Sequence, residues 1–227
     1  MTRKQLLETG ASAALLSSVA AATASCAASE PRFQFDRARF ADILAKPAQH
    51  RQCCASAKTA GGAVLSVMLA TLYAYKYDLN EGAGTVHEVA VLYHPSGVML
   101  GLDDAIWNEF LIPALPHLST TMRADLTFDG TPAAHGGNPF LHRERNTALE
   151  DDSSIEALVS RGSHLFVCNN ALSGLSGTLA NALHRTEADV YARLLGGLVP
   201  GAMAVPAGVM AINACQEAHF TYLQATL

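Results

Sequence analysis

The fold is indicated by the stretch Val89-Ala90-Val91-Leu92-Tyr93, which is continuously apolar and ends at the turn His94-Pro95-Ser96-Gly97. A strand that is apolar on both faces is typical of the centre of a parallel sheet, because helices cover both sides of such a sheet. Further strands are predicted at 164–167 and 202–205, and a helical pattern follows each of them. This alternation predicts an α/β domain with a small, mostly parallel sheet and helices on both faces, a three-layer fold of the flavodoxin or Rossmann type.

Helix and strand patterns extend from this stretch in both directions. Asp36 and Thr186 are candidate N-caps, and Pro47 stops the first helix. Between about 113 and 150 the pattern is irregular, with one short strand expected at 122–128, and excursions of this length are often functional. The predicted elements are strands at 86–93, 122–128, 164–167, 202–205 and 221–224, and helices at 36–46, 61–77, 104–110, 154–161, about 169–183, 186–195 and 209–218.

The first 29 residues differ from the rest and are predicted to be an export signal that is removed. Arg3 and Lys4 form a cationic start, a weakly apolar stretch follows at 11–24, and small residues then offer cleavage sites. Residues 2–7 resemble a twin-arginine signal with lysine in place of the second arginine, and an ordinary Sec signal is the alternative. We therefore expect a single domain at 30–227 in a periplasmic or otherwise exported protein.

Other features of the chain limit its class. Thr23 to Cys26 resembles a lipoprotein cleavage box, with Thr23 where Leu is preferred, so a lipid anchor at Cys26 is the less favoured alternative. The apolar stretch near the start is too short to span a bilayer, and no transmembrane segment is expected in the mature chain. The net charge of −5 provides no basic surface for nucleic acid. The remaining cysteines are too few for a disulfide scaffold, and their disulfide state stays open: Cys53, Cys54, Cys168 and Cys215.

Candidate chemistry gathers where the strands end. Ligands of open parallel sheets bind at the carboxyl ends of the strands, so the turns at 94–97, 168–170 and 206–208 should meet there. Cys168 lies between a strand end and a helix N-terminus, where the helix dipole and free N–H groups favour the nucleophilic thiolate. Asn169 or Asn170 could cap that helix or bond to a group carried by Cys168, and His94 could orient or protonate a ligand. The alternatives are a buried structural cysteine and a histidine that bonds only to its turn.

Several segments in order resemble the DsrE/DsrF-like family. These are Phe166 to Leu172, Leu198 to Gly201, and Val205 to Ile212 with the residues that follow as far as Tyr222, and the similarity extends back through 86–110. The resemblance implies a small parallel α/β fold, homo-oligomers such as trimers or hexamers, and a link to sulfur metabolism. In the better-understood members, which are cytoplasmic, a strand-end cysteine carries persulfide sulfur in a relay, and the matching residue here is Cys168.

We therefore predict a sulfur-handling protein, a persulfide carrier or sulfurtransferase, with a sulfane-sulfur donor and a thiol acceptor as partners. The strongly apolar helix at 61–77 and the resemblance both favour a homo-oligomer. One alternative is a non-catalytic small-ligand-binding or assembly module, and another is a thiol-redox protein that uses Cys53, Cys54 and Cys168. The chain contains no phosphate loop, dinucleotide fingerprint or Ser-His-Asp signature, and its nine histidines have no metal-ligand spacing, so no cofactor or metal is expected.

Overall fold

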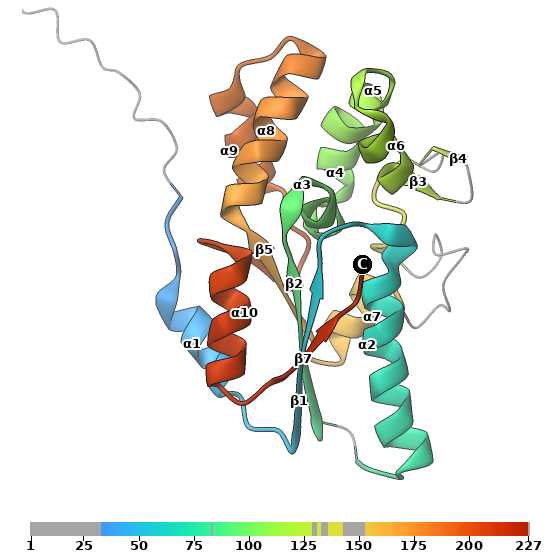
Figure 1. Cartoon of the computed structure of the whole chain (residues 1–227), viewed down its shortest axis with the longest axis vertical. Helices are drawn as coiled ribbons and strands as arrows, with labels where there is room; N and C mark the ends of the chain where they lie inside the picture. Colours follow the sequence, from blue (N-terminus) through green and yellow to red (C-terminus); the bar gives the residue numbers. More distant parts are fainter. Residues whose placement is uncertain (1–32, 83, 129–130, 133–135, 143–152, 227) are drawn as a thin grey trace, which may run out of the picture. The chain divides into compact units, whose positions relative to one another are not determined.

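Five parallel strands form a central sheet in the computed structural model of this chain (Figure 1). The structure describes residues 33–82, 84–128, 131–132, 136–142 and 153–226. All neighbouring strands of this sheet run in the same direction, so the predicted α/β class is confirmed and the sheet is wholly rather than mostly parallel. In sheet order the strands are β6 (Ala202–Val205), β5 (His164–Cys168), β2 (Val86–Leu92), β1 (His50–Ser56) and β7 (Thr221–Gln224).

Helices cover both faces of the sheet. They are α1 (Arg37–Ala45), α2 (Ala63–Tyr73), α7 (Ile155–Ser160), α8 (Asn169–Leu183), α9 (Glu187–Gly196) and α10 (Gly208–Glu217). From β1 to β6 the chain moves in one direction across the sheet, and it then crosses back to place β7 beside β1. Because crossovers between parallel strands are right-handed, this reversal puts α10 on the face opposite to α2. In Figure 1, α1 and α10 lie on one side, α2 and α7 lie on the other, and α8 and α9 extend beyond the strand ends.

The central strand β2 separates two hydrophobic cores. Its residues Val89–Leu92 are fully buried. Val89 and Val91 belong to the core beneath α1 and α10, where Phe40 packs on Phe166 with ring centroids 4.9 Å apart. The two alternate residues belong to the core formed with α2 and α8. Each Val or Leu side chain buried in this way contributes about 1.5–3 kcal/mol, so β2 is the main apolar anchor of the sheet.

Short segments connect these elements. The predicted helix 61–77 is divided into η1 (Ala60–Gly62), α2 and the π-helical turn η2 (Ala74–Asp78). About half of the described part of the excursion predicted at 113–150 is helical, and its residues 129–130, 133–135 and 143–150 lie outside the described residues. The segments between β2 and β5 are α3 (His94–Val98), η3 (Met99–Gly101), α4 (Asp104–Ile106), η4 (Trp107–Leu111), α5 (Ile112–Ala114), η5 (Leu115–His117), α6 (Thr120–Leu126), β3 (Thr127–Phe128) and β4 (Thr131–Pro132).

The structure departs from the sequence prediction at two strands. The strand predicted at 122–128 is wrong for most of its length, because α6 occupies residues 120–126 and only Thr127–Phe128 pairs in a hairpin. The Ser119 hydroxyl accepts a hydrogen bond from the Met122 backbone N–H at 3.3 Å, which satisfies a donor at the helix start. β1 escapes prediction because His50–Ser56 contains no Val, Ile, Thr, Tyr, Phe or Trp. Its pairing with β2 and β7 keeps it extended.

The export predictions fall on residues that the structure does not describe. The proposed signal at 1–29 and the proposed lipid site at Cys26 lie outside the described residues, so both rest on the sequence. Over the described ranges, no helix combines the length and the hydropathy that a membrane-crossing segment requires.

One acid is buried within the sheet. Glu88 of β2 is 1% exposed, and neither of its carboxyl oxygens has a well-formed hydrogen bond to a described residue. Burial raises the pKa of Glu88 to about 8, although the nearby Ser163 hydroxyl acts in the opposite direction. The adjacent His87 is also buried, and burial lowers its pKa to about 4. Glu88 is therefore protonated in the folded protein at neutral pH and ionised in the unfolded chain.

This difference predicts a pH-dependent stability. A group with a raised folded-state pKa loses its stabilising contribution as the pH rises from about 4.5 to about 8. His87 changes stability only below about 6.5, so the stability lost between pH 6.5 and pH 8 reports on Glu88. Glu88→Gln should remove that loss and make the protein more stable than wild type at pH 8 in urea denaturation. The exposed control Glu217→Gln should keep the wild-type slope, and a Glu88→Gln protein with an unchanged slope would contradict the assignment.

Candidate functional site

The three strand-to-helix turns predicted to meet do meet, at the carboxyl edge of the sheet. They surround a depression of about 270 Å³ that opens to solvent. One turn follows β2, the second follows β5 and the third follows β6. The depression is lined by Tyr93, His94, Pro95, Cys168, Asn170, Ala171, Ala207, Gly208 and Val209. The residues are mostly small or apolar, so the thiol is the most nucleophilic group in this lining.

Cys168 is the last residue of β5 and the N-cap of α8. It pairs with Val205 of β6, so the sheet fixes its backbone on that side. Its free thiol lines the depression, although the residue as a whole is only 6% exposed. The N-terminus of α10, which begins at Gly208, reaches the same depression. Two helices thus direct the positive ends of their dipoles, and N–H groups without intrahelical partners, toward the space around this thiol.

His94 lines the same depression as Cys168 and has an uncommon backbone conformation. Its φ is 66°, in the left-handed region that a non-glycine residue seldom adopts. The side chain is exposed and follows Tyr93 directly at the end of β2. Such conformations cost free energy and often occur at functional sites. The turn therefore puts His94 in the lining of the depression, and its role toward a ligand stays a prediction.

The two asparagines after Cys168 differ in position. Asn170 is exposed and lines the depression. The Asn169 side chain instead accepts a hydrogen bond from the Tyr191 hydroxyl at 2.5 Å, which ties the start of α8 to α9. Neither of them caps the helix, because the capping position belongs to Cys168. Of the pair, Asn170 is the residue placed to contact a ligand.

Two contributors to the site are not found by sequence reasoning. A Cβ atom added at Gly208 would lie 2.5 Å from the Tyr93 Cβ and 3.5 Å from the Cys168 Cβ, so only glycine allows the third turn to approach. Tyr93 forms the wall between the turns, and its hydroxyl contacts the side chain of Gln224 on β7 at 3.2–3.4 Å. In the sequence, these two contributors are marked only by position: Gly208 follows a Pro-Ala pair after a strand, and Tyr93 ends an apolar run.

The other described cysteines lie away from this edge. The register puts Cys53 beside Val89, and Val89 beside His164, which is four residues before Cys168. Two strand spacings of about 4.8 Å and four residues of about 3.3 Å separate the two cysteines, whereas a disulfide needs Cα atoms within about 7 Å. Cys54 occupies the next position of the same strand. A disulfide from Cys168 to either residue would require the sheet to open.

The other described thiols are buried. Cys53 and Cys215 lie in the core beneath α1 and α10. A hydrogen bond to Cys53, together with burial, raises the pKa of Cys215. Burial raises the pKa of Cys54 on the opposite face of the sheet. All of these described cysteines are free thiols, and Cys168 is the member of the set that reaches a solvent-open cavity.

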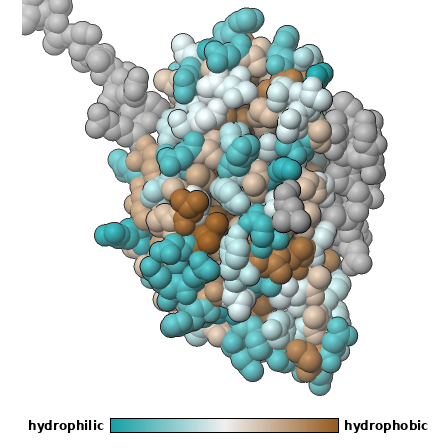
Figure 2. Space-filling model, in the orientation of Figure 1, coloured by the Kyte–Doolittle hydropathy of each residue, from teal (hydrophilic) through white to brown (hydrophobic). Residues whose placement is uncertain are grey.

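The described surface exposes a few large apolar side chains. On the face shown in Figure 2, hydrophobic residues form small, separate patches. Val209, at the depression, is 70% exposed, and exposed apolar residues also occur at Tyr77, Leu79, Tyr222 and Leu223.

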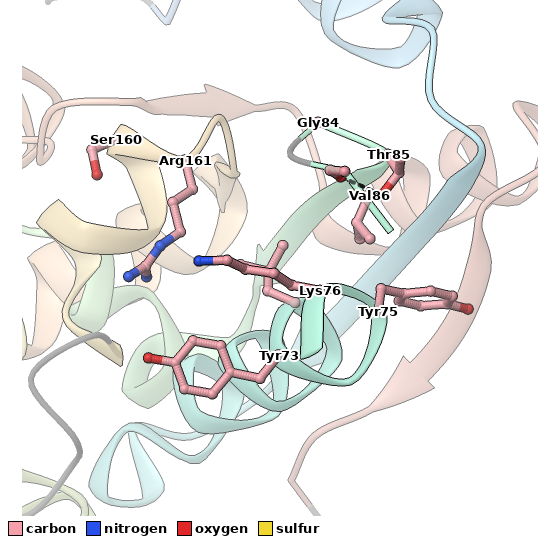
Figure 3. A pocket seen from close by; sticks show the side chains of 10 residues that line it. Tyr73, Tyr75, Lys76, Gly84, Thr85, Val86, Ser160 and Arg161 are labelled. Atoms are coloured by element: carbon pink, nitrogen blue, oxygen red, sulfur yellow. Dashed lines mark hydrogen bonds between the residues drawn. The ribbon is translucent and has the colours of Figure 1, made fainter. Parts of the chain in front are cut away.

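A larger cavity, of about 370 Å³, lies at the opposite edge of the sheet (Figure 3). The homo-oligomer predicted from the sequence stays a prediction.

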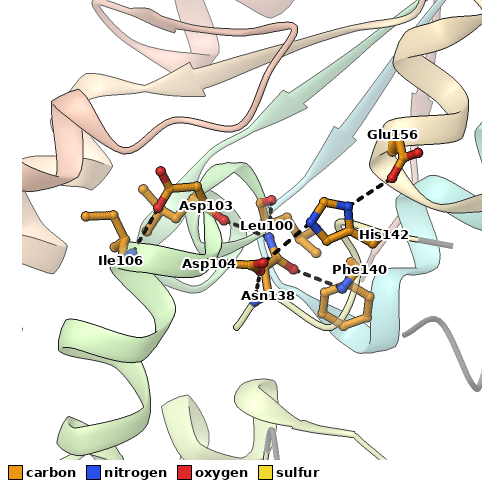
Figure 4. A network of polar contacts seen from close by, with 9 residues as sticks. Leu100, Asp103, Asp104, Ile106, Asn138, Phe140, His142 and Glu156 are labelled. Atoms are coloured by element: carbon orange, nitrogen blue, oxygen red, sulfur yellow. Dashed lines mark hydrogen bonds and ion pairs between the residues drawn. The ribbon is translucent and has the colours of Figure 1, made fainter. Parts of the chain in front are cut away.

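A cluster of acidic side chains and a histidine lies elsewhere in the molecule, and its contacts are structural (Figure 4). His142 Nδ1 lies 2.9 Å from Glu156 Oε2, and its Nε2 lies 3.4 Å from Asp104 Oδ2. The buried Asn138 beside it donates to two backbone carbonyl oxygens at 3.0 and 2.7 Å, and its own N–H donates to Asp104 at 2.8 Å. These contacts hold residues 136–142 against α4. Within the described ranges, no three His, Cys, Asp or Glu side chains are grouped so that they could hold a metal ion.

Comparisons with known proteins find no relative of this chain. No family model, no curated protein and no solved structure matches it. The resemblance to the DsrE/DsrF-like family therefore depends on the segments quoted from the sequence. What the geometry adds is independent of that resemblance: a thiol at a strand end, between two helix N-termini, in an open depression.

The close approach at Gly208 predicts a large difference between two glycine substitutions. Gly208→Ala should destabilise the fold by about 1–3 kcal/mol, because its Cβ would overlap the Tyr93 Cβ. Gly196→Ala in α9 is the matched control, since a Cβ there meets nothing within 4 Å, and it should be neutral or stabilising by up to about 1 kcal/mol. Urea denaturation measures both. Equal stabilities for the two variants would show that the third turn does not pack as described.

Proposed function

We propose that the protein handles sulfur through Cys168, as a persulfide carrier or sulfurtransferase. The observation that supports this proposal most is the convergence of the Cys168 thiol with the N-termini of α8 and α10 in an open depression. Helix N-termini favour negative charge, and the thiolate is the form of cysteine that attacks sulfur. The family resemblance supports the same reading.

The electrostatic setting suits both forms of the carrier. Attack requires the thiolate, and the loaded form, a persulfide, is also an anion when deprotonated. The free N–H groups of the first turns of α8 and α10 can donate to either sulfur anion. In the depression, Asn170 adds an amide and His94 an imidazole at the rim. The site thus offers donors to a sulfur anion from the backbone and from two side chains.

The proposed transfer is balanced without an oxidant. The Cys168 thiolate attacks the sulfane sulfur of a donor persulfide, a new sulfur–sulfur bond forms, and the bond to the donor's own sulfur breaks. The electron pair of the broken bond leaves with the donor as a thiolate. An acceptor thiolate then attacks the terminal sulfur, and Cys168 departs as a thiolate again. In this proposal His94 gives a proton to the leaving group or takes one from the incoming thiol.

The size of the depression indicates which donors suit it. A volume of about 270 Å³ is slightly below the range of about 300–1,000 Å³ that is common for small-molecule sites. Pro95, Ala171 and Val209 line it with apolar surface. A low-molecular-weight persulfide or the tip of a partner protein's cysteine loop fits these dimensions.

The same apolar lining favours the second candidate function, a non-catalytic module that binds a small apolar ligand beside an unreactive Cys168.

The experiment is peptide-resolved mass spectrometry of the full chain after exposure to glutathione persulfide. We expect the Cys168 peptide to gain one sulfur atom, and to lose it when a thiol acceptor is added. The peptides with Cys53, Cys54 and Cys215 serve as internal controls and should stay unchanged, because the core buries these thiols.

A His94→Gln protein should load sulfur at least about tenfold more slowly than wild type if the imidazole moves the proton.

The result that would overturn the proposal is an unmodified Cys168 peptide, or equal gain on all cysteine peptides. Cys168→Ser distinguishes the alternatives further, because a ligand-binding module should keep its stability and ligand affinity without the thiol. The melting temperature of each variant, measured beside the mass spectra, shows that the loss of loading is not a loss of fold.

A further inference from the structure

Two cysteines of the core beneath α1 and α10 contact each other. Cys53 belongs to β1, and Cys215 belongs to α10. Both side chains are fully buried, and both are free thiols in the structure. A hydrogen bond joins the two side chains, so their sulfur atoms are neighbours within this core. The sulfur chemistry proposed for Cys168 does not use this pair.

The sequence of α10 explains why this helix comes close to the sheet. The buried residues of α10 are Gly208, Ala211 and Cys215, all of which have small side chains. The separation of two packed elements depends on the side chains between them, and small ones allow the backbones to approach. The Cys215 thiol therefore reaches β1 without a large side chain in between.

The turn after α10 holds the same two residues together through the backbone. The Phe220 N–H donates a hydrogen bond to the Cys215 carbonyl oxygen at 2.9 Å. Two residues later, Tyr222 pairs directly with Cys53 in the sheet. The helix end that carries Cys215 is thus fastened to the strand that lies beside Cys53, and this arrangement does not depend on the thiols themselves.

The fold separates the other pairs of described cysteines. Successive side chains of a strand point to opposite faces of the sheet, so Cys54 lies in the other core, away from both Cys53 and Cys215. Cys168 lies beside Gly208 at the start of α10, and Cys215 is about two helical turns, or roughly 10 Å, further along that helix. Among the described cysteines, Cys53 and Cys215 are therefore the pair that the closed fold brings together.

We propose that Cys53 and Cys215 are an oxidation site: when the chain folds in an oxidising environment, they form a disulfide that ties β1 to α10. The export predicted from the sequence would bring the chain into such an environment. The bond closes a loop that contains most of the described chain, so it restricts the unfolded state strongly and stabilises the folded one.

The oxidant is a small-molecule disulfide such as oxidised glutathione. The thiolate of one cysteine attacks this disulfide, a mixed disulfide forms, and one glutathione thiolate leaves. The thiolate of the other cysteine then attacks the protein sulfur of the mixed disulfide, and the second glutathione thiolate leaves. Two cysteine thiols are oxidised, one glutathione disulfide is reduced, and the two thiol protons pass to the glutathione thiolates. Because the closed core buries both thiols, the exchange takes place before the core closes or while it opens transiently.

The test is refolding of the full chain from urea in a mixture of reduced and oxidised glutathione, followed by trypsin cleavage without reductant and mass spectrometry. We expect a peptide that contains Cys53 linked to the peptide that contains Cys215. Cys53 and Cys54 fall in the same tryptic peptide, so variants distinguish them. The link should be lost in Cys53→Ala and Cys215→Ala, and it should remain in Cys54→Ala, the equally buried control, and in Cys168→Ser.

Urea denaturation of the linked protein measures the effect of the bond on stability. Dithiothreitol should lower the urea midpoint of the wild-type protein by about 1 M, as expected for the loss of a disulfide that closes a long loop. The Cys215→Ala protein should have the same midpoint with and without dithiothreitol.

Three outcomes would overturn this proposal. The first is a refolded wild-type protein in which Cys53 and Cys215 both stay free thiols. The second is a link that disappears in Cys54→Ala or Cys168→Ser, which would assign the bond to another pair. The third is an equal urea midpoint for the linked and the reduced protein. The wild-type peptide map decides the first point even if a core variant fails to fold, and a Cys168→Ser protein that keeps the link separates this site from the proposed sulfur transfer.

Discussion

Burial of β2 on both faces is the constraint on which the rest of the structure depends. A strand whose residues Val89–Leu92 are fully excluded from water must also satisfy its backbone groups within the protein, so it needs a strand on each side. It also needs a helical layer above and below. β1 and β5 supply the neighbouring strands, and α10 and α2 supply the layers. Right-handed crossovers then make the sheet parallel and bring all the carboxyl ends to one edge.

That arrangement gives the two edges of the sheet different electrostatic character. Helices begin at the carboxyl edge, so the N-termini of α8 and α10 face Cys168 there. Helices end at the amino edge, where cations interact favourably with helix C-termini. Arg161 caps α7 at that edge, and Lys76 follows α2. One edge therefore brings two helix N-termini together around Cys168, and the other brings cationic side chains to helix C-termini.

Much of this arrangement can be predicted from the sequence, because the signals are local. The run at 89–93 shows a doubly buried strand. The predicted N-cap Asp36 accepts a hydrogen bond from the Arg39 backbone N–H, whereas Thr186 occupies its predicted N-cap position without such a bond. The meeting of three turns follows from the parallel class alone. β1 cannot be predicted in the same way, because only its neighbours on both sides keep its polar and cysteine-rich residues extended. The approach of Gly208 to Tyr93, the Tyr191 contact of Asn169 and the contact of Cys53 with Cys215 arise from residues distant in sequence, and no local pattern encodes them.

The central proposal is that Cys168 is the reactive thiol of this fold, because it lines a solvent-open depression, whereas the other three thiols that the structure describes lie within the core. The most direct measurement is the alkylation rate of each cysteine in the native full chain, read peptide by peptide with iodoacetamide. The account predicts that Cys168 is modified first, and that Cys53, Cys54 and Cys215 react only as fast as the protein unfolds. Alkylation of Cys168 at the same slow rate as Cys54, or a faster reaction at Cys215, would contradict it.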